Sequence, residues 1–276
     1  SEVMELRIWK LDAFAEKLFE GNPAAVIPLE AWLPDDQMLA IAAENNLSET
    51  AFFVPSTPGN FARCHLRWFT PEVEVSLCGH ATLATAHVVL THLAPALDTV
   101  TFATKSGDLA VSRGHAGLLE MALPAYQAAP HPQAEEFIEA LEEALDVAPR
   151  EILKANYPIA IFETVDEILE AEADSTLAET LDEFGETGIM ITAAGGDTGF
   201  DFVSRFFAPG KGIAEDPVTG SAHAALAPLW ARRLGKPRLK ARQLSARGGT
   251  VDCEEQGERV LMRGRVTPYL EGIIRI

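Results

Sequence analysis

Two stretches of the chain, RWFTPEVEVSLCGHATLATAHVVL (Arg67–Leu90) and RFFAPGKGIAEDPVTGSAHAALAPLWARRL (Arg205–Leu234), follow the same plan. Each begins with an arginine and two aromatic residues just before a proline, continues through acidic residues, and reaches a glycine that opens a run of small and apolar residues. Apolar runs of this length with almost no charge are typical of helices that are buried on all sides. The sequence therefore predicts a central helix over Gly79–Leu93 and an equivalent helix that begins at Gly220.

The similarity between the two halves continues outside these stretches. Upstream, Ser48–Phe52 matches Gly185–Ile189, and downstream Ser106–Asp108 matches Arg247–Gly249. The matches keep their order along the chain, and their offsets stay between 137 and 141 residues. We interpret this as an internal duplication. It predicts an α+β fold of two similar lobes, each a mostly antiparallel sheet wrapped around its apolar helix.

The expected first lobe covers residues 1–125, and the expected second lobe covers residues 126–266. A final strand at about 267–276 is expected to return to the first lobe. A helix near Asp35–Asn46 has the usual start and stop signals, with Pro34 in its first turn, acidic residues next to it and two asparagines at its end. Strand-like runs surround this helix at Glu5–Leu11, Ala24–Ile27, Ala51–Val54 and Phe61–Phe69.

The bulk composition excludes several classes of function. The chain has 276 residues and a net charge of −19, which argues against a nucleic-acid partner because phosphate binding needs clustered Lys and Arg. It has no run of about 18 apolar residues, so we expect no membrane span, and its first ten residues do not resemble a signal sequence. We therefore expect a cytoplasmic protein. Three cysteines without a CxxC pair favour neither a disulfide framework nor a structural zinc site.

The charge is unevenly distributed. Between Ala134 and Glu183 there are 16 Asp or Glu against two basic residues, and between Arg232 and Arg247 there are seven Lys or Arg and no acid. The acidic stretch is typical of solvated helical faces. The basic stretch is also expected on the surface, although it could attract anions if it lies near a site.

The starts of the two apolar helices are candidate anion sites. They read Cys78-Gly79-His80 and Thr219-Gly220-Ser221. Helix N-termini carry free N–H groups and the positive end of the helix dipole, which suits a carboxylate or a phosphate. The alternative is that these residues are only helix caps, with Thr219 and Ser221 bonding to backbone.

With these motifs in place, the sequence resembles a known family, the phenazine-biosynthesis PhzF-like proteins, which share the two-lobed diaminopimelate epimerase fold. The similar stretches span most of the chain: DAFAEKLFEGNPAAV (Asp12–Val26), NNLSETAF (Asn45–Phe52), Arg67–Val88, Asp201–Lys236 and QLSARGG (Gln243–Gly249). The acidic region from Tyr126 to Glu183 is the least similar.

The resemblance implies an isomerase or epimerase with a site between the lobes that needs neither a cofactor nor a metal. It assigns the acid–base role to Glu49 in LSETAF, with His80 and Asp216 as further catalytic residues. Substrate-binding roles fall on Gly79, His80, Gly220 and Ser221, whose amides would hold the carboxylate of a small anionic metabolite. The resemblance also implies a homodimer.

The residues themselves limit the possible mechanisms. A carboxylate at Glu49, flanked by Leu47 and Phe52, would be partly withdrawn from water, which suits proton transfer. The repeat places Thr219 opposite Cys78, so a pair of facing thiols is not available as two bases. Cys78 is then either an inert small residue or a thiol with a pKa lowered by the helix start. Glu186, matched to Glu49, is expected to be structural.

Other sites are less favoured by their spacing. Ser221 and His223 are two residues apart on a predicted helix and point in different directions, which argues against a hydrolase. His87 and His92 are five residues apart, unlike the i,i+4 pair of a zinc helix, and Gly195–Gly199 is expected to form a turn. The remaining rival to an isomerase is a ligand-binding or scaffold protein that keeps the cleft without catalysis.

Overall fold

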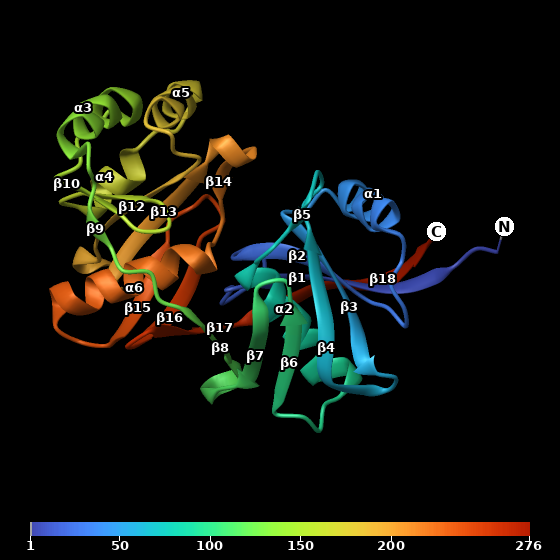
Figure 1. Ribbon diagram of the computed structural model, residues 1–276. Helices are drawn as coiled ribbons and strands as arrows, with labels where there is room; N and C mark the ends of the chain where they lie inside the picture. The colour runs from blue at the N-terminus through green and yellow to red at the C-terminus, as the bar shows by residue number, and fades with distance from the viewer. Residues whose placement is uncertain (1) are drawn as a thin grey trace. The chain divides into compact units, whose positions relative to one another are not determined.

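The computed structural model describes residues 2–276, which form two compact units. Unit 1 runs up to Ala122 and also contains Arg263–Ile276, and unit 2 is Leu123–Met262. The chain leaves unit 1 within strand β8 (Leu119–Pro124) and returns to it within β17 (Arg259–Gly264) (Figure 1).

In unit 1 a sheet wraps around one helix, α2 (Gly79–Val88). The strand order is β18-β1-β2-β3-β4-β6-β7-β8, with the short β5 also paired to β4. Neighbouring strands are antiparallel except for β2–β3 and β4–β6, which are parallel. Helix α2 contacts β1, β2, β3 and β18, and α1 contacts β3 and β4. The other elements are β1 (Glu5–Ala13), β2 (Asn22–Pro28), α1 (Asp35–Asn45), β3 (Glu49–Thr57), β4 (Asn60–Phe69), β5 (Glu74–Val75), β6 (Thr99–Thr104), β7 (Gly107–Arg113) and β18 (Val266–Arg275).

The composition of α2 explains its central position. Every residue of the helix except His87 is buried, and most of them are Gly, Ala or Thr, which let the strands approach closely. The buried hydroxyls of Thr82 and Thr85 donate to carbonyls four residues earlier, so they cost little to bury. The helix continues as a π-helical turn over Val89–Leu93. The predicted buried helix is confirmed.

Unit 2 repeats this architecture around α6 (Gly220–Leu234). Its strand order is β9-β10-β11-β12-β13-β15-β16-β17, with β14 also paired to β13. The parallel pairs are β11–β12 and β13–β15, at the same places in the order as in unit 1. The elements are β9 (Ala129–Pro130), α3 (Ala134–Leu145), β10 (Glu151–Lys154), β11 (Pro158–Ile161), α4 (Val165–Glu170), α5 (Ser175–Glu183), β12 (Ile189–Ala194), β13 (Phe202–Ala208), β14 (Ile213–Asp216), β15 (Arg238–Gln243) and β16 (Gly249–Gln256).

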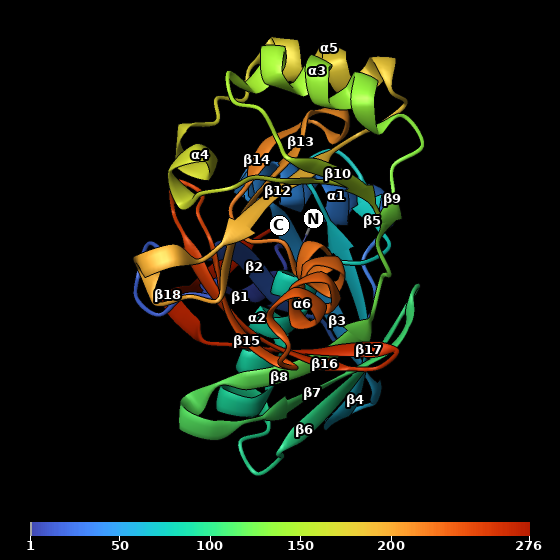
Figure 2. The same ribbon diagram turned by 90° about the vertical axis from the view of Figure 1, so that its left-hand side faces the viewer.

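The acidic stretch supplies the outer helices of unit 2. Helices α3 and α5 lie side by side (Figures 1 and 2). Their apolar residues, such as Phe137, Leu141 and Leu177, enter a core shared with β12 and β13. The acidic side chains of α3 occupy the opposite, exposed positions. The predicted solvated helical face is confirmed.

The duplication is also visible in a repeated ion pair. Arg67 on β4 donates two hydrogen bonds to Glu74 on β5, at 2.9 and 2.8 Å. Arg205 on β13 donates two to Glu215 on β14, at 3.0 and 2.8 Å. The same bidentate pair therefore joins the equivalent strands of both units, which supports the two arginines as corresponding residues.

The sheet register corrects one of the sequence matches. The arginine of β4 faces Phe52, three residues after Glu49. The arginine of β13 faces Ile191, three residues after Gly188. The position equivalent to Glu49 is therefore Gly188, and the match to Glu186 is wrong by two residues. The shared Glu-Thr dipeptide suggested that match, whereas the backbone ladder sets the true correspondence.

None of the helices in residues 2–276 combines the length and the apolar character that crossing a bilayer requires.

Candidate active site

Glu49 lies at the junction between helix α1 and strand β3. Helix α1 ends at Asn46, which adopts a left-handed conformation (φ 51°) and turns the chain. Strand β3 then begins at Glu49, which pairs in parallel register with Ala24. The Glu49 side chain is 12 % exposed, and its Oε2 lies 3.0 Å from Nε2 of His80. The two atoms face each other, and both are buried.

His80 belongs to the first turn of α2, directly after Gly79. Cys78 precedes the helix in an extended conformation, and its Sγ lies 3.4 Å from Nδ1 of His80. The imidazole therefore has the thiol on one ring nitrogen and Glu49 on the other. No side chain in the described part of the protein caps this helix start, so its first N–H groups point outward as donors.

Burial and charge set the protonation of this group. Burial disfavours the imidazolium, but Cys78 and Glu49 outweigh it and raise the pKa of His80 well above its ordinary value. Burial, assisted by the Glu49 charge, raises the pKa of the Cys78 thiol to about 11. Near neutral pH the Cys78 thiol is therefore neutral. The alternative of a lowered thiol pKa is wrong, because desolvation and the Glu49 charge outweigh the lowering effects of His80 and of the Ala81 backbone N–H.

In unit 2 the start of α6 is organised by Gln243, a residue that the sequence did not single out. Its Oε1 accepts from the Thr219 backbone N–H at 2.8 Å. Its Nε2 donates to the Asp216 carbonyl at 2.8 Å and to the Thr219 hydroxyl at 3.2 Å. The Thr219 hydroxyl donates to the Asp216 carboxylate at 2.5 Å. Gln243 is fully buried, so this network fixes Asp216 against the helix start.

Gly220 and Ser221 follow this network as the first residues of α6. The Ser221 carbonyl accepts a hydrogen bond from Nδ2 of Asn156 at 3.2 Å. Asn156 lies in the turn between β10 and β11 and was also missed, because an isolated asparagine in a turn carries no distinctive pattern. As at α2, no side chain caps the helix start among residues 2–276. The alternative that Thr219 and Ser221 are caps is therefore wrong.

The structure thus groups the predicted residues by unit. Glu49, Gly79 and His80 lie together in unit 1, and Asp216, Gly220 and Ser221 lie together in unit 2. That both sets act on one substrate stays a prediction.

Glu186 has a different environment from Glu49. Its carboxylate forms an ion pair with Lys154 on β10, and His131 lies 3.6 Å away. Since its charge is already matched by a lysine, we interpret Glu186 as structural.

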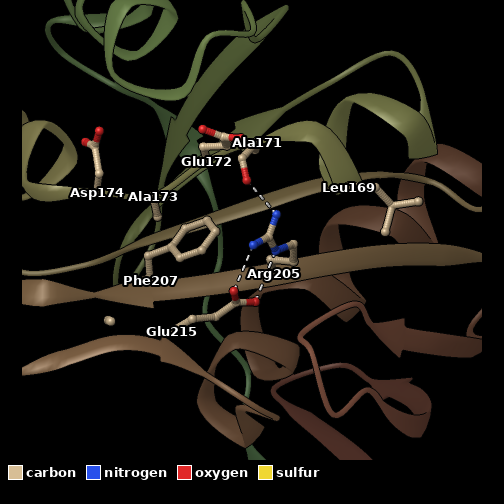
Figure 3. Close-up of a pocket in the computed structure, with 9 residues that line it drawn as sticks. Leu169, Ala171, Glu172, Ala173, Asp174, Arg205, Phe207 and Glu215 are labelled. Carbon is tan, nitrogen blue, oxygen red and sulfur yellow. Dashed lines mark hydrogen bonds and ion pairs between the residues drawn. The ribbon is translucent and has the colours of Figure 1, made fainter.

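A separate cavity of about 560 Å³ in unit 2 contains none of the predicted site residues. Arg205 lines it, and its guanidinium is held by Glu215 on one side and by the Ala171 carbonyl on the other (Figure 3). The Ile168 carbonyl also accepts from Arg205. Glu172 and Asp174 add negative charge to its lining. Because the guanidinium is committed to these partners, the cavity is poorly suited to an anionic substrate.

Two copies of a sheet-wrapped helix, each with an uncapped N-terminus and nearby acidic residues, define a duplicated α+β fold of the epimerase class. A hydroxyproline epimerase from Agrobacterium vitis shares this fold, with a TM-score of 0.64 at 12 % identity over 99 % of this chain and 93 % of that one. The predicted fold class is confirmed.

Comparison at higher identity defines the family. Residues 11–272 match the family described as phenazine biosynthesis-like protein. A Pseudomonas aeruginosa protein named as an uncharacterized isomerase is 47 % identical over 99 % of this chain and 100 % of its own length. The crystal structure of an Enterococcus faecalis phenazine biosynthesis protein of the PhzF family has a TM-score of 0.88 at 38 % identity, covering 99 % of this chain and 100 % of that one. This chain belongs to the phenazine biosynthesis-like family. The names of these relatives support an isomerase role.

Proposed function

We propose that this protein is a cofactor-independent isomerase or epimerase that moves a proton on a small carboxylate-bearing metabolite, with Glu49 as the acid–base residue. The observation that carries this proposal is the buried contact between Glu49 and His80 at the open start of α2. A carboxylate in this setting can take a proton from carbon and return it to another position or face of the substrate.

The neighbouring groups have complementary roles. The free N–H groups at Gly79 and His80 would hold the substrate carboxylate and the negative charge that develops as the proton leaves. The imidazolium of His80 would stabilise the same charge and keep the Glu49 carboxylate in place. Since the Cys78 thiol is neutral near pH 7, it does not compete as a base.

The unit 2 residues would complete the site. Asp216 would orient the substrate or assist the transfer, and the N–H groups at Gly220 and Ser221 would bind its carboxylate. The hydroxyproline epimerase of the same fold was solved with trans-4-hydroxy-L-proline bound, which is a small carboxylate of this kind. We further propose that the protein acts as a cytoplasmic homodimer.

The experiment that tests this function works even though the substrate is unidentified. A set of small carboxylic acids is screened by thermal shift, and each hit is incubated with the protein in deuterated buffer and followed by NMR. An isomerase of this kind incorporates solvent deuterium at a carbon of its substrate. Hits that bind without any deuterium uptake would instead identify a binding protein that has kept the cleft without catalysis.

A further inference from the structure

Glu49, Cys78 and His80 together form a compact set of metal-ligand side chains within unit 1. One candidate ligand atom from each residue lies within 4.8 Å of the other two. A carboxylate oxygen, a thiolate sulfur and an imidazole nitrogen are all ordinary ligands of Zn²⁺. The set is therefore chemically suited to a thiophilic divalent cation, in addition to proton transfer.

The spacing of two of these atoms matches a coordination site. Zn²⁺ binds sulfur at about 2.3 Å and nitrogen at about 2.0–2.1 Å, so two such ligands at a tetrahedral angle are separated by about 3.6 Å. Sγ of Cys78 and Nδ1 of His80 are 3.4 Å apart. An ion bound between them would need only a small adjustment of either side chain.

The third candidate ligand, the Glu49 carboxylate, contacts His80 through Oε2. Oε2 of Glu49 and Nε2 of His80 are buried, and apart from facing each other neither has a hydrogen-bond partner among residues 2–276. The side chain of His80 is only 6 % exposed. Rotation of the Glu49 side chain would carry Oε2 from Nε2 toward the ion, and this oxygen would give up only its contact with His80.

Charge also favours binding of a divalent ion. A thiolate and a carboxylate together offset a divalent charge, so the ion and its ligands would be close to neutral within a largely buried cluster, which avoids the main penalty of burying an ion.

We propose that Glu49, Cys78 and His80 form a Zn²⁺-binding site. The ion is bound by the carboxylate of the acid–base residue, which is then not free for proton transfer. Metal binding and proton transfer then exclude each other, because both use the Glu49 carboxylate. Zn²⁺ would act as a reversible inhibitor. The inhibition rests on the proposed function, whereas binding of the ion is independent of it and can be measured without a substrate.

The test uses Co²⁺ as a spectroscopic probe of the purified full chain. We expect one Co²⁺ per chain, a thiolate-to-cobalt charge-transfer band, and displacement of Co²⁺ by Zn²⁺. The band should be lost in Cys78→Ser, whereas Cys64→Ser and Cys253→Ser, which alter buried cysteines elsewhere, should retain it. Glu49→Gln and His80→Asn should each weaken Zn²⁺ binding by about tenfold or more.

Circular dichroism of each variant separates loss of a ligand from loss of the fold. Absence of the band in the wild-type protein would overturn the proposal, as would a band that persists in folded Cys78→Ser. Equal loss in Cys64→Ser or Cys253→Ser would point to a different site and would overturn it as well. None of these results bears on deuterium uptake, so failure here is distinguishable from failure of the proposed isomerase.

Discussion

Glu49 combines a largely buried carboxylate with a histidine neighbour at the start of a helix. The side chain of Glu186, matched to it in the sequence, is buried to a similar extent, at 11 % exposed against 12 %, but forms an ion pair with Lys154. Burial therefore does not distinguish the two glutamates. Their partners do, because Lys154 stays charged near neutral pH, whereas the histidine beside Glu49 can itself take up or release a proton.

Replacing Glu49 with glutamine tests this assignment. Glu49→Gln keeps the size of the side chain but removes the base, so deuterium uptake by a substrate found in the screen should fall by about 100-fold or more. Affinity measured by calorimetry should stay near the wild-type value. The matched control is Glu44→Gln, which makes the same change on the exposed face of α1 and should leave uptake unchanged. Retention of more than about a tenth of the wild-type rate would rule out Glu49 as the base.

His223 is a second residue whose burial has a measurable consequence. It lies in α6 with its Nδ1 2.7 Å from the Thr219 carbonyl. Burial lowers the pKa of His223 to about 4, and the bond to Thr219 only partly offsets this effect. The folded protein therefore keeps His223 neutral at a pH where the unfolded chain, with a pKa near 6.5, is already protonated.

The sign of this linkage gives a pH prediction. Above pH 6.5, His223 is neutral in both states and does not lower the unfolding free energy. As the pH falls toward 4, the unfolding free energy decreases, because the unfolded chain takes up a proton at His223 that the folded protein does not. Between pH 7.5 and 4.5, wild type should lose about 2 to 3 kcal/mol more of its unfolding free energy than His223→Asn. Urea titrations at the two pH values measure this, and the comparison cancels contributions from other groups. Parallel losses in both proteins would contradict the assigned cause.

At the scale of elements, the start of α6 depends on a side chain from a different strand. Gln243 ends β15, yet it supplies three hydrogen bonds to the segment from Asp216 to Thr219. Small apolar residues make α6 a buried helix, but they do not determine how its first turn is held. That role falls to a buried amide, which can donate and accept at once.

Removing this amide should be costly. Gln243→Leu abolishes all three bonds within a buried site, and we expect a loss of about 2 kcal/mol or more in unfolding free energy. Gln243→Glu keeps an acceptor for the Thr219 N–H but buries a charge against the Asp216 carbonyl, so it should not restore the stability. Denaturant unfolding measures both variants, and hydrogen exchange should show reduced protection of the Thr219 amide in Gln243→Leu. A leucine variant as stable as wild type would exclude the proposed role.

At the scale of the whole molecule, the chain is one architecture used twice. The two units share their strand order, the positions of their parallel pairs and the arginine–glutamate pair that joins two equivalent strands. They differ at the helix starts. Unit 1 has a thiol and a histidine where unit 2 has a threonine and a serine, so the duplicated scaffold carries unlike chemistry in its two halves.

The two helix starts, with their different residues, predict how a ligand is bound. In a crystal structure with a bound substrate or a carboxylate analogue, N–H groups from Gly79 and Gly220 should both face the same anion, with Glu49 beside the reacting carbon. Hydrogen bonds reach about 3 Å, so amides more than about 15 Å apart in a closed, ligand-bound form could not share one small carboxylate. Such a separation would remove the shared anion site and the mechanism built on it.

The duplication, the two buried helices and the candidate residues could all be predicted from the sequence. Runs of small apolar residues, glycine at each helix start and the order of matching motifs are local properties, readable from neighbouring positions. Helix α1 was predictable for the same reason, because Pro34 and Asn46 signal its ends within the chain itself.

Tertiary structure alone decided how these residues act. The neutral thiol of Cys78, the correspondence of Glu49 with Gly188 and the hold of Gln243 on Thr219 all depend on contacts between segments that are far apart in the chain. No local pattern encodes such contacts, since strand register and burial depend on packing by the rest of the sheet. The protonation of the site follows from that burial, because withdrawal from water and the charges brought alongside, rather than residue type, set the pKa of the thiol and the histidine.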